Sequence, residues 1–306
     1  MSPVVRFPPA LAHMTLRGIV AFAQTLDDEE ADSFGAALGR MFHRLAKSRR
    51  NIARKNLRRA FPELNDSSGL SELTLRVFEN LGRNLAEVAR FPLYSAEKRV
   101  EMIAIERDEL IHEIAARKCG CMFVTPHFGN WELIGSWLPA HKYQTSFLAG
   151  AKTNSSVNRL LNDLRRHIGV EIIQTGASAR PVMSALRRGE FVGMVTDQHA
   201  AIGHEVVEFF GRKVAAHRGP ALFAYRTGAA ILPGFLVRKG PARHEGWVEE
   251  PIFADRSQPE AVEVWSITQR VMSLFENAIR KYPASWMWTH RRWKALPDSQ
   301  NDTNHS

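Results

Sequence analysis

The chain has 306 residues but only two cysteines, and its histidines show no metal-ligand spacing. Cys119 and Cys121 are separated by one residue, which is too close for a disulfide, and two cysteines are too few for a structural zinc site. We interpret both as buried thiols in a reducing cytoplasm. Among the twelve histidines, His199 and His204 lie five residues apart and His217 is isolated. We therefore expect no bound metal.

The amino-terminal part also lacks a long apolar run. Its longest one, Gly18 to Ala23, is bounded by Arg17 and Gln24 and falls far short of the roughly 20 residues that cross a bilayer. Residues 1–10 contain three prolines and one arginine, which is not the pattern of a signal peptide. We expect neither a spanning helix nor a signal peptide.

Acidic residues are absent from residues 40–59, although this segment is strongly charged. It contains nine basic residues: Arg40, Arg44, Lys47, Arg49, Arg50, Arg54, Lys55, Arg58 and Arg59. The rest of the chain balances in charge, so the segment carries the whole formal net charge of +9. Apolar residues recur there near helical spacing, which predicts a basic amphipathic helix or a pair of helices. These residues are Phe42, Leu45, Ile52, Leu57 and Phe61.

The one-sided charge of this segment indicates an anionic partner. An ordinary solvated helix face would explain the apolar spacing but not the absence of acids. Anionic headgroups attract basic side chains by about 1 kcal/mol per residue near a membrane, and an acidic carrier protein would also be attracted. Nucleic acid is not expected, because only Phe42 and Phe61 offer stacking platforms and no nucleic-acid motif is present. The expected docking residues are Arg49, Arg50, Arg54 and Lys55.

Hydrophobic periodicity predicts an α/β protein with a helical start. We expect helices at 31–60, 70–90 and 97–117, and then strands at 121–125, 145–149, 170–173 and 191–196 that alternate with helices at 131–140, 155–167 and 179–188. Further expected elements are a helix from Gly219-Pro220 to Arg226, a strand at 231–237 interrupted by Pro233-Gly234, and a helix at 258–281. Residues 1–115 would pack as a helical region on an α/β core of 116–296, forming one structural domain, with a disordered tail at 297–306.

A histidine and a carboxylate follow the first expected strand. Asn130 is suited to cap the helix that comes next. His127 and Glu132 are five residues apart and would diverge on one continuous helix, so the loop between them is what lets imidazole and carboxylate meet. A histidine oriented by an acid can take a proton from a hydroxyl. The alternative is a histidine that caps or packs at the end of a strand.

A second polar cluster follows the strand 191–196. Asp197 and Gln198 stand there in the position that His127 has after the first strand. Neighbouring parallel strands open into one crevice at their carboxyl ends, so we expect both clusters to line one site. Asp197 taken alone is also compatible with a turn or a cap.

The segment His127-Phe-Gly-Asn-Trp-Glu132 resembles the hallmark of the bacterial lipid A biosynthesis (late) acyltransferases, within the lysophospholipid acyltransferase superfamily. In that family a histidine is followed after four residues by an acid, and tryptophan before glutamate is typical of the lipid A branch. Six further similar segments lie in family order: 49–63, 154–169, Asp197-Gln198, Phe209-Phe210-Gly211, Thr227-Gly228-Ala229 and Trp286–Lys294. Together the matches cover most of residues 34–294.

The resemblance implies a glycerolipid-acyltransferase-like α/β fold, a mostly parallel sheet flanked by helices with an amino-terminal basic helical segment. It implies an acyltransferase that moves a fatty acyl chain from acyl carrier protein, or acyl-CoA, to a hydroxyl of an anionic glycolipid such as a lipid A precursor. His127 would be the base, polarised by Glu132, and a cation with backbone N–H groups near Gly129 would stabilise the oxyanion. No cofactor is expected, because the thioester is a co-substrate. The expected location is the cytoplasmic face of the bacterial inner membrane, with peripheral attachment.

The chain departs from the family at one cation. Family members carry an arginine shortly before the asparagine that matches Asn154, whereas here the cation is Lys152. Lysine supplies charge but not the planar fork of arginine, so Arg165 or Arg166 is an alternative. The expected substrate-binding residues are Asn130, Lys152, Arg165, Arg166, Asp197 and Gln198.

The segment 286–294 combines tryptophan with arginine, a mixture found at membrane interfaces. We expect Trp286, Trp288, Arg291 and Arg292 to contact a membrane or a carrier. The alternative is that the tryptophans pack this segment onto the sheet while the arginines face substrate phosphates.

Two other functions fit the same residues. One is a same-fold acyltransferase that acts on another lipid, such as a phosphoinositide mannoside or a lysophospholipid. The other is a non-catalytic lipid-binding or carrier-binding relative that lost turnover with the family arginine. A covalent acyl-enzyme is not expected, because no serine lies in a Gly-x-Ser-x-Gly turn.

Overall fold

The computed structural model describes residues 9–65, 67–149, 156–174 and 179–296. The helices are α1 (Pro9–Ala23), α2 (Asp28–Leu45), α3 (Lys47–Ala60), α4 (Ser67–Ala89), α5 (Ala96–Glu101), α6 (Glu109–Arg117), α7 (Trp131–Ala140), α8 (Ser156–His167), α9 (Arg180–Arg187), α10 (Gly219–Thr227) and α11 (Glu260–Lys281), with short 3-10 helices η1 (Pro62–Asn65), η2 (Phe91–Leu93) and η3 (Pro283–Ser285). The strands are β1 (Ile103–Glu106), β2 (Cys121–Thr125), β3 (Thr145–Ala149), β4 (Val170–Gln174), β5 (Phe191–Val195), β6 (His204–Phe209), β7 (Arg212–His217), β8 (Ala230–Gly240) and β9 (Arg243–Val248).

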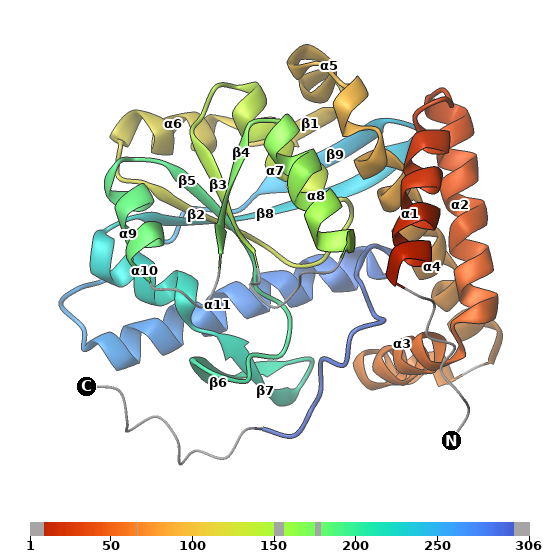
Figure 1. Cartoon of the computed structure of the whole chain (residues 1–306). Coiled ribbons are helices and arrows are strands. Elements are labelled where there is room, and N and C mark those ends of the chain that lie inside the picture. Colours follow the sequence, from red (N-terminus) through yellow and green to blue (C-terminus); the bar gives the residue numbers. More distant parts are fainter. Residues whose placement is uncertain (1–8, 66, 150–155, 175–178, 297–306) are drawn as a thin grey trace.

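The main sheet has seven strands in the order β1-β9-β8-β2-β5-β3-β4 (Figure 1). The five strands from β8 to β4 are parallel, whereas β9 runs antiparallel to β8, and β1 is parallel to β9. β6 and β7 form a separate antiparallel hairpin. The expected mostly parallel sheet flanked by helices is therefore confirmed. β2 and β5 are direct neighbours, with Cys121 opposite Phe191, so the two polar clusters do leave the same edge of the sheet.

Alternate residues of β2 divide the core into two layers, as the two-residue period of a strand requires. Cys121 and Phe123 belong to a buried cluster with side chains of α6 and α7. Met122 and Val124 belong to a cluster with side chains of α9, α10 and α11. Cys121 is buried as expected, whereas Cys119 is only half-buried, and both thiols are free.

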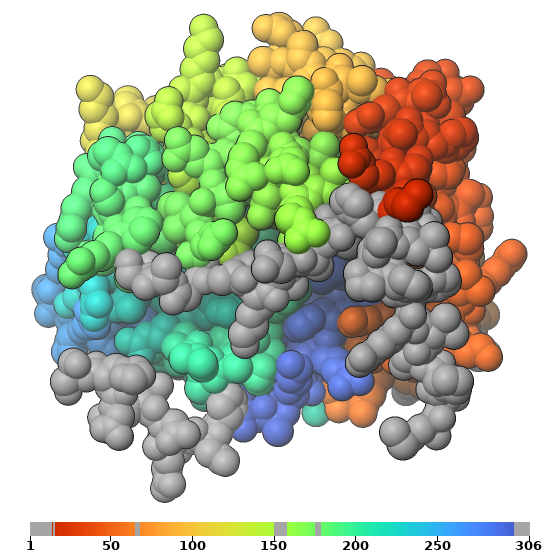
Figure 2. Space-filling view, in the orientation of Figure 1, coloured from red at the N-terminus to blue at the C-terminus, as the bar shows by residue number. Residues whose placement is uncertain are grey.

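The basic segment 40–59 is a pair of helices, since α2 ends at Leu45 and α3 begins at Lys47. Leu57 of its apolar set is buried, whereas Phe42 is 48% exposed and Leu45 is 73% exposed. The apolar spacing therefore does not describe one core-facing stripe, and the corner between α2 and α3 carries apolar side chains in solvent. The amino-terminal helices form the right-hand side of the molecule in Figures 1 and 2. Among the described residues, no helix is both long and apolar enough to span a bilayer.

Two expected elements are wrong. Residues 97–117 are not one helix: β1 lies between α5 and α6 and joins the main sheet, so the segment 1–115 is not purely helical. The strand expected to break at Pro233 is continuous in β8. Pro233 is the last β8 residue paired with β2, and pairing with β9 begins at Gly234, so the missing proline N–H falls where the strand changes partner. Residues 297–306, expected to be disordered, lie outside the described residues.

Glycines allow α2 and α4 to approach closely, which yields a first prediction. A Cβ at Gly82 would lie 2.1 Å from the carbonyl oxygen of Gly35 and 2.6 Å from the nitrogen of Gly39. Because both obstacles are backbone atoms, Gly82→Ala must push the helices apart, and we expect a loss of about 1–3 kcal/mol or more in the free energy of unfolding.

The matched control is Gly69→Ala in the same helix, where the nearest atom would be 3.9 Å away. It should stabilise the protein slightly, by roughly 0.5–1 kcal/mol, because alanine restricts the unfolded chain more than glycine does. Urea unfolding of both variants measures the difference. Equal effects of the two substitutions would contradict a close helix contact at Gly82.

Candidate active site

His127 and Asp197 form the centre of the site, at the carboxyl ends of β2 and β5. The Nδ1 atom of His127 lies 2.6 Å from Oδ1 of Asp197, and the backbone N–H of His127 donates to Oδ2 of Asp197 at 3.1 Å. The indole N–H of Trp286 donates to the same Oδ2 at 2.6 Å. The carboxylate is buried and binds three N–H groups from two separate parts of the chain.

These contacts keep Asp197 ionised. Burial raises the pKa of its carboxyl group, but the His127 charge and the hydrogen bonds from His127 and Trp286 outweigh burial and hold this pKa at about 2. An ionised Asp197 accepts a proton-bearing Nδ1, so in the neutral form of His127 the lone pair is on Nε2. Nε2 is 3.3 Å from the side-chain nitrogen of Gln198. His127 therefore has the tautomer that a general base requires, with Nε2 as the reactive atom.

Glu132 has a different partner from the one we expected. Nε of Arg165 donates to Oε2 of Glu132 at 2.8 Å, and the indole N–H of Trp131 donates to Oε1 at 3.1 Å. Glu132 lies in the first turn of α7, beside Arg165 of α8, whereas the end of β5 brings Asp197 to His127. The expected pairing of His127 with Glu132 is thus replaced by a pairing with Asp197, a residue for which we had expected substrate binding.

Glu132 still borders the site through its neighbour. The Trp131 ring contacts the imidazole of His127 edge to face, with 5.0 Å between ring centroids. The guanidinium of Arg165 binds Glu132 and also lies over the ring of Phe147, so it is largely withdrawn from solvent. The buried Glu132–Arg165 ion pair is therefore a support for Trp131 and for the junction of α7 with α8.

The backbone of the loop 127–130 is hydrogen-bonded to the carboxyl-terminal segment. The N–H of Met287 donates to the His127 carbonyl at 2.9 Å, and the N–H of Gly129 donates to the Ser285 carbonyl at 2.8 Å. Gly129 has φ +53°, and a Cβ there would lie 1.6 Å from the Leu236 carbonyl oxygen, so only glycine fits. The Gly129 N–H, expected to stabilise an oxyanion, is thus already bound.

Behind this loop lies a buried polar network that the sequence did not reveal. Oδ1 of Asn130 accepts the N–H of Leu133, as expected of a helix cap, and its Nδ2 donates to Glu87 at 2.7 Å. Both polar ends of Asn130 are therefore used within the protein, which gives it a structural role, while its expected part in substrate binding stays a prediction. Asn84 donates to the Gly129 carbonyl, and Arg238 binds both Asn84 and Glu87.

This network contains a second buried carboxylate. Burial raises the pKa of Glu87, but the charges of His244 and Arg238 outweigh burial and hold it at about 2. Asn84 and Glu87 are on α4, more than forty residues before the loop, and they belong to no motif. Their three-residue spacing puts them on one face of the helix, which is the only local signal they give.

Much of the carboxyl-terminal segment is packed inside the protein. Trp286, Trp288 and Arg292 have exposures of 3%, 0% and 1%, so the membrane or carrier contact expected of them is wrong. Arg292 donates to the Ala215 carbonyl at 3.0 Å, and burial lowers its pKa to about 10 despite the opposing charge of Asp197. Arg291 is exposed. The alternative interpretation, in which the tryptophans pack this segment onto the fold, is confirmed.

The remaining expected cations are scattered. Arg166 pairs with Asp163 on the surface at 2.9 Å, and no described hydrogen bond joins it to His127. Lys152 lies outside the described residues. In α3, Arg49 donates to the Thr289 carbonyl at 3.3 Å. Arg50 donates to the carbonyls of His43 and Arg44 at the end of α2. Arg54 is half-buried and Lys55 is exposed.

An apolar pocket of about 380 Å³ lies beside the site. Trp131 and Glu132 line it together with apolar side chains of α4 that include Leu81 and Val88. Phe42 and Arg49, both exposed, line it as well, so it opens to the surface at the corner between α2 and α3. Its volume is typical of ligand-binding pockets.

The family model described as bacterial lipid A biosynthesis acyltransferase matches residues 11–295. The chain belongs to this family. It is 29% identical over 224 residues to the phosphatidylinositol mannoside acyltransferase of Mycobacterium tuberculosis (strain ATCC 25618 / H37Rv). The aligned residues make up 71% of this chain and 69% of the relative. It is 24% identical over 271 residues to the lipid A biosynthesis palmitoleoyltransferase of Escherichia coli (strain K12), with 86% and 84% covered, and 25% identical over 276 residues to the lauroyltransferase of the same strain.

Membership confirms the resemblance found in the sequence, and the protein is an acyltransferase. In the part of the chain that the structure describes, no group of three or more His, Cys, Asp or Glu side chains has the arrangement of a metal site.

Histidines near Asp197 make the stability of this acyltransferase depend on pH. Burial lowers the pKa of His290 to about 4. The charge of Asp197 opposes this shift, and the charges of His127, Lys294 and Arg292 add to it. Between pH 4 and pH 6.5 the folded state therefore binds fewer protons than the unfolded state, so stability rises with pH in this window. We expect the free energy of unfolding to fall on acidification from pH 6.5 towards pH 4.

His290→Gln should flatten this dependence, because it removes a group that is protonated on unfolding. Urea unfolding at pH 7 and pH 5 measures the slope. His167→Gln, at an exposed position of α8, is the control and should leave the slope unchanged. A His290→Gln slope equal to that of the wild type would contradict the assignment.

Proposed function

We propose that this acyltransferase moves a fatty acyl chain from a thioester to a hydroxyl of an anionic glycolipid, with His127 as general base and Asp197 as the carboxylate that orients it. The observation that carries this proposal is the hydrogen-bonded pair of half-buried His127 and buried Asp197 beside an open apolar pocket. The pair takes over the orienting role for which the sequence had suggested Glu132.

The reaction is a direct transfer. Nε2 of His127 takes the proton of the acceptor hydroxyl as the hydroxyl oxygen bonds to the thioester carbon, and the carbonyl becomes an oxyanion. The tetrahedral species then breaks its C–S bond, and the proton on Nε2 passes to the leaving thiolate. The products are an ester and a free thiol, and His127 returns to its starting state. Asp197 stabilises the imidazolium that forms between the two steps.

Gln198 is the proposed oxyanion donor among the described residues. Its side-chain amide lies beside Nε2 of His127, where the reacting carbonyl must come. Lys152, the cation nearest in sequence to the missing family arginine, stays a prediction for the same role. Arg165 is less suited, because it is bound to Glu132.

The apolar pocket is the proposed site of the acyl chain. Its lining is mostly apolar, and it adjoins Trp131, which touches His127. A buried chain in this pocket would place the thioester carbon next to the imidazole. We propose acyl carrier protein as the donor, with acyl-CoA as the alternative, and a reaction that uses no cofactor.

The acceptor is proposed to be a lipid A precursor. The relatives named lipid A biosynthesis palmitoleoyltransferase and lauroyltransferase support this choice because the alignment with each covers 86% of this chain. A phosphatidylinositol mannoside is the second candidate, favoured by the higher identity, 29%, to the mycobacterial relative. Incubation of the purified protein with acylated carrier protein and each lipid, followed by mass spectrometry, distinguishes the two. Absence of an acylated product with any lipid acceptor would contradict the proposal.

Kinetics of variants can identify the carboxylate that serves His127. We expect His127→Ala to lower kcat by roughly 10²- to 10⁴-fold, and Asp197→Asn to lower it by at least about 10²-fold, because general base catalysis contributes this much and the amide can present the wrong hydrogen-bonding group to Nδ1. Circular dichroism checks that both variants stay folded.

The control addresses Glu132. Removing one member of a buried ion pair lowers the free energy of unfolding by about 3–5 kcal/mol. A loss of activity in Glu132→Gln alone could therefore come from unfolding instead of from a catalytic defect. The double variant Glu132→Gln with Arg165→Gln leaves no unpaired charge, and it should retain more activity than Asp197→Asn. If the double variant were folded but inactive while Asp197→Asn kept wild-type turnover, Glu132 and not Asp197 would be the orienting acid.

The basic helix α3 is proposed to hold the protein on the cytoplasmic face of the inner membrane, or to dock the acidic carrier, next to the mouth of the apolar pocket. Lys47, Lys55 and Arg58 are exposed, and the exposed Leu45 precedes them. Basic side chains contribute about 1 kcal/mol each at an anionic surface. Peripheral attachment there would also be weakened by salt.

Vesicle binding tests this role of α3. Changing Lys47, Lys55 and Arg58 together to glutamine should weaken binding to anionic vesicles by up to roughly 10²-fold, at about 1 kcal/mol per charge. Arg212, Lys213 and Arg270, changed together to glutamine, remove the same charge elsewhere and should have little effect. Unchanged binding of the α3 variant with reduced turnover on acylated carrier protein would assign α3 to the carrier instead of the membrane.

A further inference from the structure

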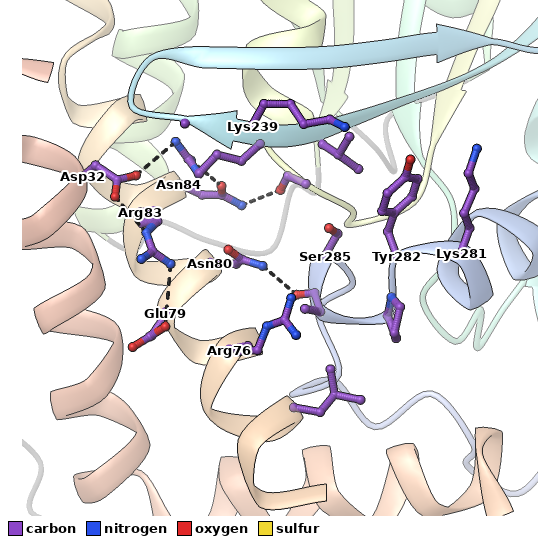
Figure 3. Close-up of a pocket in the computed structure, with 17 residues that line it drawn as sticks. Asp32, Arg76, Glu79, Asn80, Arg83, Asn84, Lys239, Lys281, Tyr282 and Ser285 are labelled. Atoms are coloured by element: carbon purple, nitrogen blue, oxygen red, sulfur yellow. Dashed lines mark hydrogen bonds and ion pairs between the residues drawn. The ribbon is translucent and has the colours of Figure 1, made fainter. Parts of the chain in front are cut away.

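A second pocket, polar and distinct from the apolar one, lies between α2, α4, the end of β8 and the end of α11. It has a volume of about 570 Å³ (Figure 3). Neither His127 nor Asp197 lines it, but Gly129 and Arg238 do. A ligand in this pocket would therefore touch residues that hold the catalytic loop without touching the reacting groups.

Three cations of this pocket are already paired with carboxylates. Arg83 binds Asp32 at 3.0 Å, and Arg238 binds Glu87. Lys239 binds Glu245 at 2.8 Å. Glu79, which also lines the pocket, pairs with Arg40 at 2.9 Å. These four cations and four carboxylates balance in charge, so they do not by themselves call for a ligand.

Two further cations of the pocket differ from these. For Arg76 of α4 and Lys281 of α11, the described residues offer no carboxylate at ion-pair distance. Nζ of Lys281 lies 5.4 Å from the ring centroid of Tyr282 and 5.7 Å from that of Trp247, so its position is set by aromatic faces. The two cations come from different helices, on separate sides of the pocket (Figure 3).

Neutral donors lie between these cations. Tyr282 and Ser285 both line the pocket, and the described part of the chain supplies no hydrogen-bond partner for either hydroxyl (Figure 3). Figure 3 shows Ser285 between Arg76 and Tyr282. The pocket thus combines a guanidinium, an ammonium and two hydroxyls, all donors without a described acceptor.

We propose that this pocket binds a phosphate ester. A guanidinium offers a planar fork to phosphate oxygens, and lysine adds a point charge. The volume exceeds what a bare phosphate needs and is of the size that holds a small organic ligand, so the phosphate carries a polar headgroup such as glycerol. The headgroup comes either from an anionic phospholipid or from a soluble phosphate ester.

Isothermal titration of the full chain with glycerol 3-phosphate tests the site. Glycerol is the uncharged control ligand and should not bind. The double variant Arg76→Gln with Lys281→Gln should weaken binding of glycerol 3-phosphate by at least about tenfold. Both side chains are exposed, so the variant should keep the stability of the wild type within about 0.5 kcal/mol, which a thermal melt verifies.

The matched control is Arg212→Gln with Arg270→Gln, which removes the same charge from exposed positions outside the pocket. It should bind glycerol 3-phosphate like the wild type. Equal weakening in the two double variants would show general electrostatic attraction and overturn the site. Absence of heat from about 10 mM glycerol 3-phosphate, together with unaltered binding to phosphatidylglycerol vesicles, would overturn it as well.

A vesicle arm identifies the source of the phosphate. If the pocket takes a lipid headgroup, the Arg76 and Lys281 variant should bind phosphatidylglycerol vesicles more weakly than its control, and phosphatidylcholine vesicles equally. If the ligand is soluble, titration with glycerol 3-phosphate should change while vesicle binding does not. Neither readout uses acyl transfer, so the result is independent of the proposed reaction.

Discussion

The site depends on one buried carboxylate, that of Asp197. Three N–H groups converge on it, two from His127 and one from Trp286, so the ends of β2 and β5 and the carboxyl-terminal segment meet at two oxygen atoms. An ionised carboxylate in the interior is tolerated only when its lone pairs are taken by such donors. The same requirement that stabilises the fold here also fixes the tautomer of His127. Structure and proposed chemistry therefore rest on a single set of hydrogen bonds.

The sequence correctly predicted the two strands that carry His127 and Asp197 and the start of the helix after His127. The strands at 121–125 and 191–196 are short apolar runs followed by polar residues, and buried parallel strands have this appearance. Asn130 was correctly expected to cap α7, because a cap is a local property of a few residues. What failed was the choice of partner. The five-residue spacing of His127 and Glu132 suggested a contact, yet pairing across β2 and β5 brings Asp197 closer.

Other residues gave no usable signal. Asn84 and Glu87 hold the loop 127–130 from α4, and Arg238 reaches them from β8, but each lies in an element that reads as ordinary helix or strand. Such contacts link positions far apart in the chain and are set by tertiary packing. The tryptophans of the segment 286–294 misled for the opposite reason. Their composition is the same at a membrane interface and in a core, and burial alone distinguishes the two.

The loop 127–130 is therefore held from two directions by different kinds of contact. Backbone hydrogen bonds from Ser285 and Met287 act on one side, and the side chains of Asn84 and Glu87 act through Gly129 and Asn130 on the other. The α4 residues owe their position to the close packing of α4 on α2, which needs glycine at the contact. The amino-terminal helices are thus part of the active site's support, although no residue of theirs touches His127 by a described hydrogen bond. Because the polar pocket opens among the same supports, a ligand bound there would contact Arg238 and Gly129, which hold the loop, and would not contact His127 or Asp197.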